Sequence, residues 1–200
     1  MVTGHLLMTI GHSTLDLSAF LKALGDNGVK RLVDVRSFPG SRRYPWFGRD
    51  SLEQSVPASG IAYQWMPTLG GRRKAAAESV NGAWRNESFR GYADYMQTPE
   101  FASGLAELIA ISQREQTAYM CSEAVPWRCH RSLISDALTA RGFRVEHIFV
   151  KPNGESERKP HSMTPFARVT GGAANPQVTY PLDKPDEPEQ SEIPFGAKGS

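Results

Sequence analysis

The chain has 200 residues, of which 40% are hydrophobic and 22% charged, the composition of a soluble globular protein with one domain and some residues to spare. None of its apolar runs approaches the length needed to cross a bilayer, which excludes a membrane-spanning class. The formal net charge of +2 is too small to indicate a polyanionic partner by itself.

The first third of the chain alternates short apolar runs with amphipathic stretches and turn residues. The apolar runs predict buried strands, and Asp16 before a helix-spaced apolar pattern predicts a helix cap. Pro57 ends the second amphipathic stretch. In chain order we expect a strand over 6–10, a helix from Asp16 to Gly25 or Gly28, a strand over 31–36, a short helix over 50–57 and a strand over 61–66.

An irregular segment over 74–84, rich in Ala, Ser and Gly, follows and is expected to be mobile. After it we expect two helical pieces within 89–113 broken at Pro99, a strand over 117–120, a helix over 127–141 stopped by Gly142, and a strand over 145–150. Segments 161–169 and 177–180 predict a small appended β element. The acidic, Pro-rich segment 182–200 predicts a disordered tail.

The repeated strand–helix–strand order predicts a single α/β domain over residues 1–181, with a mainly parallel sheet flanked by helices. Sheets of this class bind ligands at the carboxyl ends of their strands. The polar groups expected at this edge are His12 and Ser13, Asp34 and Arg36, Gly70 to Arg72, and Cys121 to Glu123. Because they follow four different strands, we expect them to share one cleft.

Five ordered motifs carry a resemblance to a known family. They are segment 9–14 (TIGHST), segment 32–39 (LVDVRSFP), segment 69–72 (LGGR), the pair 121–123 (CSE) with 129–131 (CHR), and segment 161–169. Over roughly residues 7–181 the chain resembles the domain-of-unknown-function 488 family. This implies a compact α/β fold and a set of polar positions, with no established reaction. Val125 departs from the pattern, because a polar helix cap is expected there.

The strand end at Cys121 offers thiol chemistry. Arg128, His130 and Arg131 in the following turns would favour a thiolate, whereas Glu123 would raise the pKa of the thiol. The alternative is an inert buried cysteine. A weaker similarity to rhodanese-like domains, which also carry an Asp-Val-Arg strand end and a later cysteine, is an analogy only.

A metal site is disfavoured by the predicted helix over 127–141. Cys129 and His130 would lie about 100° apart on that helix and could not easily bind one ion together with Cys121. Cys129 is better explained as a core residue, on the same side as Leu133. We therefore expect neither a metal nor another cofactor. The cysteine pattern and the absence of a signal peptide indicate a reducing, cytoplasmic location.

Acid–base chemistry on a phosphate is the other possibility for this edge. Its candidate proton-transfer groups are His12, Glu123 and His130. The candidate substrate-binding residues are Ser13, Asp34, Arg36, Arg42, Arg43, Gly70, Gly71, Arg72 and Arg131. Asp34 and Arg36 could instead form a pair that organises the pocket, and Glu123 could pair with an arginine.

The segment from Arg36 to Arg90 holds nine basic and four acidic residues, and its loop over 41–49 interleaves arginines with aromatic residues. Such a loop suits single-stranded nucleic acid or nucleotides, or else packs on the core with its arginines in water.

The leading hypothesis is an enzyme acting on a phosphate-bearing substrate, a nucleotide or nucleic acid. The alternatives are a Cys121-dependent sulfurtransferase or phosphatase-like enzyme and a non-catalytic nucleic-acid-binding module. The expected partner is thus an anionic small molecule or nucleic acid, with no membrane, and the oligomeric state stays open.

Overall fold

The computed structural model describes residues 4–40, 42–151, 153–172 and 175–182. Its strands are β1 (Leu6–Gly11), β2 (Arg31–Asp34), β3 (Ala62–Trp65), β4 (Thr117–Cys121), β5 (Arg144–Val150), β6 (Ser156–Pro160), β7 (Arg168–Thr170) and β8 (Gln177–Thr179). Its α-helices are α1 (Leu17–Asp26), α2 (Arg49–Ala58), α3 (Glu87–Tyr95), α4 (Pro99–Ser112) and α5 (Arg131–Ala140). Three 3₁₀ turns are η1 (Pro45–Phe47), η2 (Pro67–Leu69) and η3 (Pro126–Arg128). The predicted tail falls almost wholly on residues 183–200, outside the described part.

Six strands form one sheet in the order β3-β2-β4-β1-β5-β6, in which only β6 runs antiparallel to its neighbour. The mainly parallel sheet of a single α/β domain is therefore confirmed. The antiparallel pair β7–β8 confirms the small appended element. β6 was not predicted, because its sequence SERKP has no apolar alternation and pairs on one side only, at the edge of the sheet.

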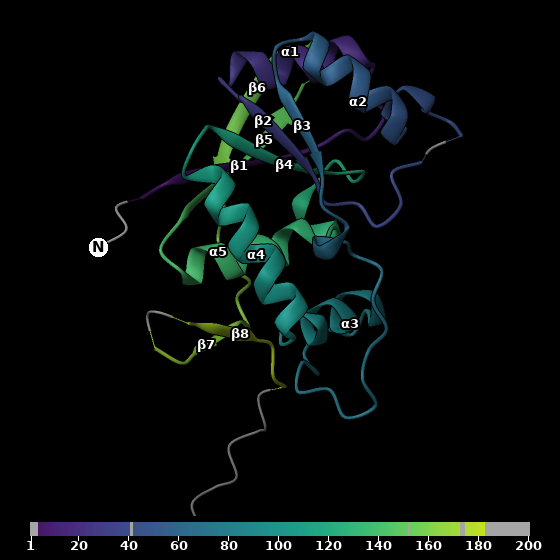
Figure 1. The fold of residues 1–200 in the computed structure, drawn as a ribbon. Coiled ribbons are helices and arrows are strands. Elements are labelled where there is room, and N and C mark those ends of the chain that lie inside the picture. The colour runs from purple at the N-terminus through teal and green to yellow at the C-terminus, as the bar shows by residue number, and fades with distance from the viewer. Residues whose placement is uncertain (1–3, 41, 152, 173–174, 183–200) are drawn as a thin grey trace, which may run out of the picture.

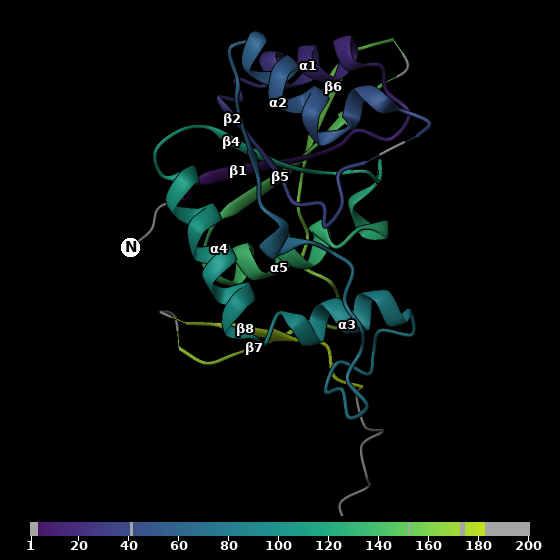
Figure 2. The same ribbon diagram turned by 45° about the vertical axis from the view of Figure 1, so that its right-hand side comes forward.

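Helices cover both faces of the sheet (Figure 1, and Figure 2 from another side). Successive residues of a strand point to opposite faces. On β1, Leu7 accordingly belongs to the core beneath α3, α4 and α5, whereas Met8 and Ile10 belong to the core beneath α1 and α2. The fully apolar strands are explained by this double burial. No helix in the described ranges is long and apolar enough to traverse a bilayer.

The helix predicted over 127–141 begins later than expected. Residues 126–128 form the 3₁₀ turn η3, and Cys129 is extended, with φ −138° and ψ 145°. α5 starts only at Arg131, with His130 as its N-cap residue. Val125 therefore precedes η3 and not α5, so its apolar side chain does not weaken the cap of the long helix.

The irregular segment 74–84 is tied to α3 by one carboxylate. Asp94 accepts hydrogen bonds from the Ala76 amide (2.8 Å), the Ser79 hydroxyl (2.5 Å) and the Asn81 side-chain amide (2.8 Å). The Asn81 side-chain oxygen in turn accepts from the amide of Tyr180. The segment has no helix or strand, as predicted, but it is tied to α3 and to Tyr180, which follows β8.

A buried chain of polar side chains joins β1, β5 and α5. The Thr9 hydroxyl lies 2.8 Å from His147 Nδ1, and His147 Nε2 lies 3.1 Å from His161 Nδ1. Asp136 accepts hydrogen bonds from His161 Nε2 and from the Tyr180 hydroxyl, both at 2.8 Å. This chain fastens the appended β element to α5.

Acid should destabilise the protein through His147. Burial, with the charges of His161 and Arg131, lowers the pKa of His147 from 6.5 to about 3. The unfolded chain then binds more protons below about pH 6.5, so stability is fully present above that pH and falls as the pH drops toward 3. We expect unfolding titrations to show a loss on the order of 3 kcal/mol between about pH 7 and pH 4.5 from this histidine.

His147→Gln should flatten this pH dependence, whereas His5→Ala, at an exposed histidine, should leave it unchanged. If the wild-type protein and His147→Gln lost the same stability between about pH 7 and pH 4.5, the acid sensitivity would not come from His147.

Candidate functional site

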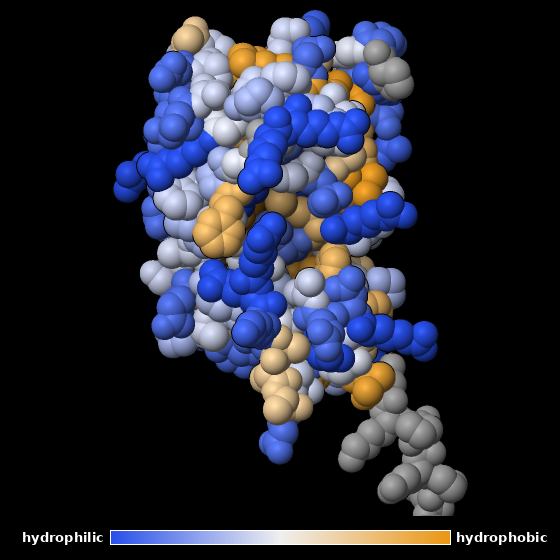
Figure 3. All heavy atoms as spheres, turned by 90° about the vertical axis from the view of Figure 1, so that its right-hand side faces the viewer, coloured by the Kyte–Doolittle hydropathy of each residue, from blue (hydrophilic) through white to orange (hydrophobic). Residues whose placement is uncertain are grey.

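The carboxyl ends of β1 and β4 lie side by side, and the chain leaves them in opposite directions. β1 continues through α1 to β2, whereas β4 continues through α5 to β5 on the far side of β1. The two loops cross, with the amides of His12 and Ser13 donating to the carbonyls of Cys121 and Ser122, and they lie at the carboxyl edge of the sheet, where proteins of this class bind ligands. Figure 3 faces this edge and shows hydrophilic side chains gathered around a hollow.

A cavity of about 250 Å³ opens at this edge. Its chemically active lining residues are Arg36, Arg72, Arg128, Cys121, Cys129 and His130, with Gly71 and Glu123 beside them. They come from the loops after β2, η2 and β4, so the convergence of separate strand ends is present. The cavity combines three arginines with two thiols and an imidazole.

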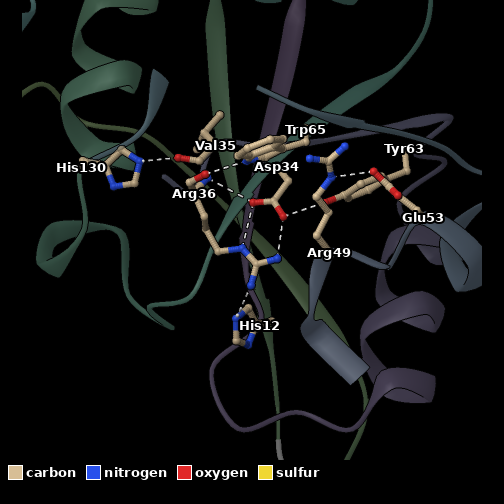
Figure 4. A network of polar contacts seen from close by, with 9 residues as sticks. All are labelled: His12, Asp34, Val35, Arg36, Arg49, Glu53, Tyr63, Trp65 and His130. Atoms are coloured by element: carbon tan, nitrogen blue, oxygen red, sulfur yellow. Dashed lines mark hydrogen bonds and ion pairs between the residues drawn. The ribbon is translucent and has the colours of Figure 1, made fainter. Parts of the chain in front are cut away.

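Arg36 is held in the cavity wall by a buried ion pair (Figure 4). Its Nε and Nη2 donate to the two carboxylate oxygens of Asp34 at 2.8 and 2.5 Å, and the Tyr63 hydroxyl donates to the same carboxylate at 2.8 Å. Burial opposes the charge of Arg36, but the hydrogen bond and charge of Asp34 outweigh it and raise its pKa. Arg36 is therefore a fixed cation, and Asp34 lies behind it, outside the lining.

His12 lies behind Arg36 and outside the cavity lining. Its Nδ1 lies 3.1 Å from the Ser13 carbonyl and its Nε2 3.3 Å from Arg36 Nη1. Because a carbonyl only accepts, Nδ1 carries the proton and Nε2 accepts from Arg36. Burial first, and then the charge of Arg36, lower the pKa of His12 to about 4. The neutral ring, stacked on Phe47, positions Arg36.

His130 brings the two thiols together. Its Nε2 lies 3.0 Å from the Val35 carbonyl and must donate to it (Figure 4), so Nδ1 is the nitrogen that faces the thiols. Nδ1 lies 3.6 Å from Cys129 Sγ and 3.8 Å from Cys121 Sγ. A β-carbon at Gly71 would lie 2.4 Å from Nδ1, so the absence of a side chain there makes room for the ring. Gly71 thus shapes the site.

The two thiols have opposite tendencies. The hydrogen bond with Cys129, and then burial, raise the pKa of Cys121. Burial also opposes ionisation of Cys129, but the hydrogen bond from Cys121 and the charge of His130 outweigh it and lower its pKa. The charge of Arg131 favours the thiolate at both sulfurs. Negative charge in this pair is therefore placed on Cys129, beside the imidazole.

Arg131 lies beneath the cavity and outside its lining. It is 1% exposed, and its guanidinium donates to the Thr9 hydroxyl at 2.9 Å and to the Glu123 carbonyl at 2.5 Å. It therefore holds the loop after β4 in place. The side chain of Glu123 is exposed and borders the cavity.

The predicted site residues divide into two groups. Cys121, Glu123, His130, Arg36, Gly71 and Arg72 line the cavity. Residues outside the lining are His12, Ser13, Asp34, Arg42, Arg43, Gly70 and Arg131. Among these, Arg42 and Arg43 are exposed in the loop after β2, and Gly70 lies against Ser37, whose Oγ would be 2.4 Å from a β-carbon.

Arg128, which was expected to act beside the Cys121 thiol, and Cys129, which was interpreted as a core residue, both belong to the lining. Pro126 is the sequence feature that could have indicated this. It begins the turn η3, which ends in an extended Cys129, so neither Arg128 nor Cys129 has the orientation expected on a continuous helix. Ser88 and Phe89 at the start of α3 also border the cavity, and no local motif marks them.

Two expectations about the cysteines change with this geometry. Cys129 is buried as predicted, but its sulfur lies beside His130 and Cys121. The helical geometry that argued against a shared ion is absent, because Cys129 and His130 both precede α5. The sulfur and nitrogen atoms of Cys121, Cys129 and His130 lie within 4.8 Å of one another.

Comparison with known proteins gives one significant result. The family model described as domain of unknown function DUF488 matches residues 16–138, which is more than half of the chain. Neither the curated proteins nor the solved structures contain a significant match. The matched range includes the Asp34–Arg36 pair and the Cys121–Cys129–His130 cluster, and it excludes His12. The chain belongs to the DUF488 family.

Proposed function

We propose that the protein is an enzyme acting on a phosphate-bearing substrate, a nucleotide or nucleic acid, in the cavity at the carboxyl edge of the sheet. The observation that carries the proposal is that three arginines, Arg36, Arg72 and Arg128, border the same small cavity as a cysteine–histidine cluster. Guanidinium groups bind phosphate oxygens through paired, charge-assisted hydrogen bonds.

The arginines have complementary roles. Arg36 is immobilised by Asp34 and His12, so it offers an anion a preorganised positive charge at low cost in side-chain entropy. Arg72 and Arg128 are exposed and can close over a ligand from the rim. A substrate phosphate would thus meet a fixed cation at the wall and two adjustable cations at the entrance.

Proton transfer falls to His130 and Glu123, which border the cavity. His130 Nδ1 faces the thiols, and its other nitrogen is engaged by the Val35 carbonyl. His12 has no such role in this proposal, because it is buried behind Arg36 and holds that side chain in place.

A second candidate function is covalent chemistry at Cys121, of the sulfurtransferase or phosphatase type. It is favoured by the 3.8 Å approach of Cys121 Sγ to His130 Nδ1 at the wall of the cavity. Cys121→Ser tests this route, because covalent chemistry requires this sulfur as the attacking atom. Turnover retained in Cys121→Ser would exclude the covalent route, and a substrate adduct on Cys121 detected by intact-protein mass spectrometry would support it.

Phosphate affinity tests the proposal. Calorimetric titration with inorganic phosphate, AMP and a short single-stranded oligonucleotide should show binding that Arg72→Ala and Arg128→Ala each weaken about tenfold, the value of one charge-assisted hydrogen bond. Arg114→Ala is the matched control, since this exposed arginine lies next to the amino end of β4.

Turnover is then measured on nucleotides, oligonucleotides and chromogenic phosphate esters. The proposal is wrong if none of these ligands binds, or if the rim variants and Arg114→Ala behave alike. Steeply salt-dependent binding of the oligonucleotide without turnover of any ester would support the non-catalytic binding module instead.

A further inference from the structure

We infer that Cys121, Cys129 and His130 are the three protein ligands of a zinc ion at the wall of the cavity. The inference rests on the proposed function only in assigning the ion a part in the reaction; the site itself is argued from the geometry of the ligands. It places a Lewis acid next to the arginines that would hold the substrate phosphate.

The ligand atoms have the spacing that zinc requires. Bond lengths of about 2.3 Å to sulfur and about 2.0 Å to nitrogen, at tetrahedral angles, separate a ligating sulfur from a ligating nitrogen by roughly 3.5 Å. His130 Nδ1 lies 3.6 Å from Cys129 Sγ and 3.8 Å from Cys121 Sγ. An ion can therefore be bound with small movements of these side chains.

The local backbone makes this convergence possible. Cys129 is extended and His130 occupies the N-cap position of α5, and their sulfur and Nδ1 atoms lie 3.6 Å apart although the residues are adjacent. Cys121 reaches the same point from the end of β4. Ligands from a strand end and from the turn before a helix give the ion a rigid frame on both sides.

The surroundings of His130 are those of a metal ligand. Zinc-binding histidines commonly donate their second ring nitrogen to a carbonyl or carboxylate, which fixes the ring and leaves the first nitrogen free to ligate. The Val35 carbonyl accepts this hydrogen bond from His130 Nε2 at 3.0 Å, and the missing side chain at Gly71 leaves space beside Nδ1.

The donor set selects the metal. Two thiolates and an imidazole favour zinc over magnesium or calcium, which prefer oxygen ligands. Three protein ligands leave one position of a tetrahedral ion for water or substrate, as in catalytic zinc sites. A bound zinc ion would polarise a phosphoryl oxygen or activate a water, and in the zinc-bound form His130 is a ligand, so proton transfer falls to Glu123 alone. Both ligand cysteines and His130 border the cavity, so a substrate held by Arg36 or Arg128 would have access to that position.

Metal content tests the inference on the full 200-residue chain. The protein is purified under reducing conditions, saturated with zinc, dialysed, and analysed by inductively coupled plasma mass spectrometry. We expect about one zinc ion per chain in the wild-type protein, and zinc affinity at least about tenfold lower in Cys121→Ser, Cys129→Ser and His130→Ala. His5→Ala and Ser122→Ala, at exposed side chains, are the matched controls and should keep wild-type zinc.

Cobalt substitution provides a second measurement. Cobalt(II) should give thiolate charge-transfer bands and the visible absorption of a tetrahedral site in the wild-type protein, and Cys121→Ser and Cys129→Ser should each weaken the charge-transfer bands. Circular dichroism and thermal unfolding in the presence of a chelator establish that the variants are folded.

Three results would overturn the site: no zinc in the reduced, folded wild-type protein, wild-type zinc affinity in any of the three ligand variants, or a Cys121–Cys129 disulfide in place of bound metal. The assay contains no substrate, so it is independent of phosphate binding. Zinc without phosphate affinity would refute the proposed function alone, and phosphate affinity without zinc would refute this inference alone.

Discussion

Gly11→Ala should destabilise the protein by at least about 3 kcal/mol, the upper end of the usual cost of overpacking, because the new methyl group would meet backbone that cannot move aside. A β-carbon at Gly11 would lie 1.7 Å from the Glu123 carbonyl oxygen and 2.8 Å from Arg131 Nη2. The loops after β1 and β4 are also tied together by the amide of His12, which donates to the Cys121 carbonyl at 3.1 Å. The clash could be relieved only if the two loops moved apart, which would break this hydrogen bond.

Gly25→Ala is the matched control for this substitution. Gly25 lies within α1, and a β-carbon there would meet no atom within 4 Å. Alanine should stabilise the helix by roughly 0.5 to 1 kcal/mol, because glycine loses more backbone entropy on folding. Urea unfolding at neutral pH measures both changes. Similar midpoints for the two variants would show that the β1–β4 loop crossing tolerates a side chain.

Asp34→Asn is expected to cost about 3 to 5 kcal/mol, because it leaves the Arg36 guanidinium buried without its counter-charge. The side chains of Asp34 and Arg36 are 0% and 5% exposed, and Asp34 also accepts the hydroxyl hydrogen of Tyr63. Asparagine has nearly the same shape as aspartate, so the loss in free energy of unfolding reports the charge and the hydrogen bonds of the Asp34 carboxylate. Arg36 should also become less well positioned, with weaker phosphate binding as a second readout.

Glu53→Gln provides the control for Asp34→Asn. The Arg49–Glu53 pair lies on α2 with both side chains 44% exposed, and such pairs contribute at most about 1 kcal/mol. In unfolding titrations, the loss in free energy of unfolding should therefore be several-fold larger for Asp34→Asn than for Glu53→Gln. A small loss for Asp34→Asn would indicate that Arg36 reaches solvent or another acceptor when Asp34 is neutralised.

The sequence was a reliable guide where one local signal decides the structure. Asp16 caps α1 by accepting the Ala19 amide hydrogen, and Pro99 begins α4 as predicted. Apolar runs marked five strands of the sheet, of which β1, β2 and β4 are buried along most of their length. α2, which was predicted to end at Pro57, extends one residue further, to Ala58. These features depend on neighbouring residues and on hydrophobic burial, both of which are visible in the order of amino acids.

The errors in the predicted elements concern interactions that cross the fold. The polar edge strand β6 forms because β5 offers it hydrogen-bonding partners, and its own residues carry no strand pattern. α5 starts later than predicted, at Arg131. The residue before it, His130, contacts Cys121 at the end of β4 and the Val35 carbonyl after β2, and no local sequence pattern shows these contacts.

By itself, the sequence determined the α/β class, the order of most elements, the strand ends at which a site could form and the resemblance to the family. Only the tertiary structure decided which polar residues border the cavity. Arg131 and His12 have side chains that could bind a substrate, but packing against distant segments buries both. Arg131 supports the loop after β4, and His12 supports Arg36. Burial and orientation arise from contacts between distant segments, so residue type alone could not distinguish a support from a ligand.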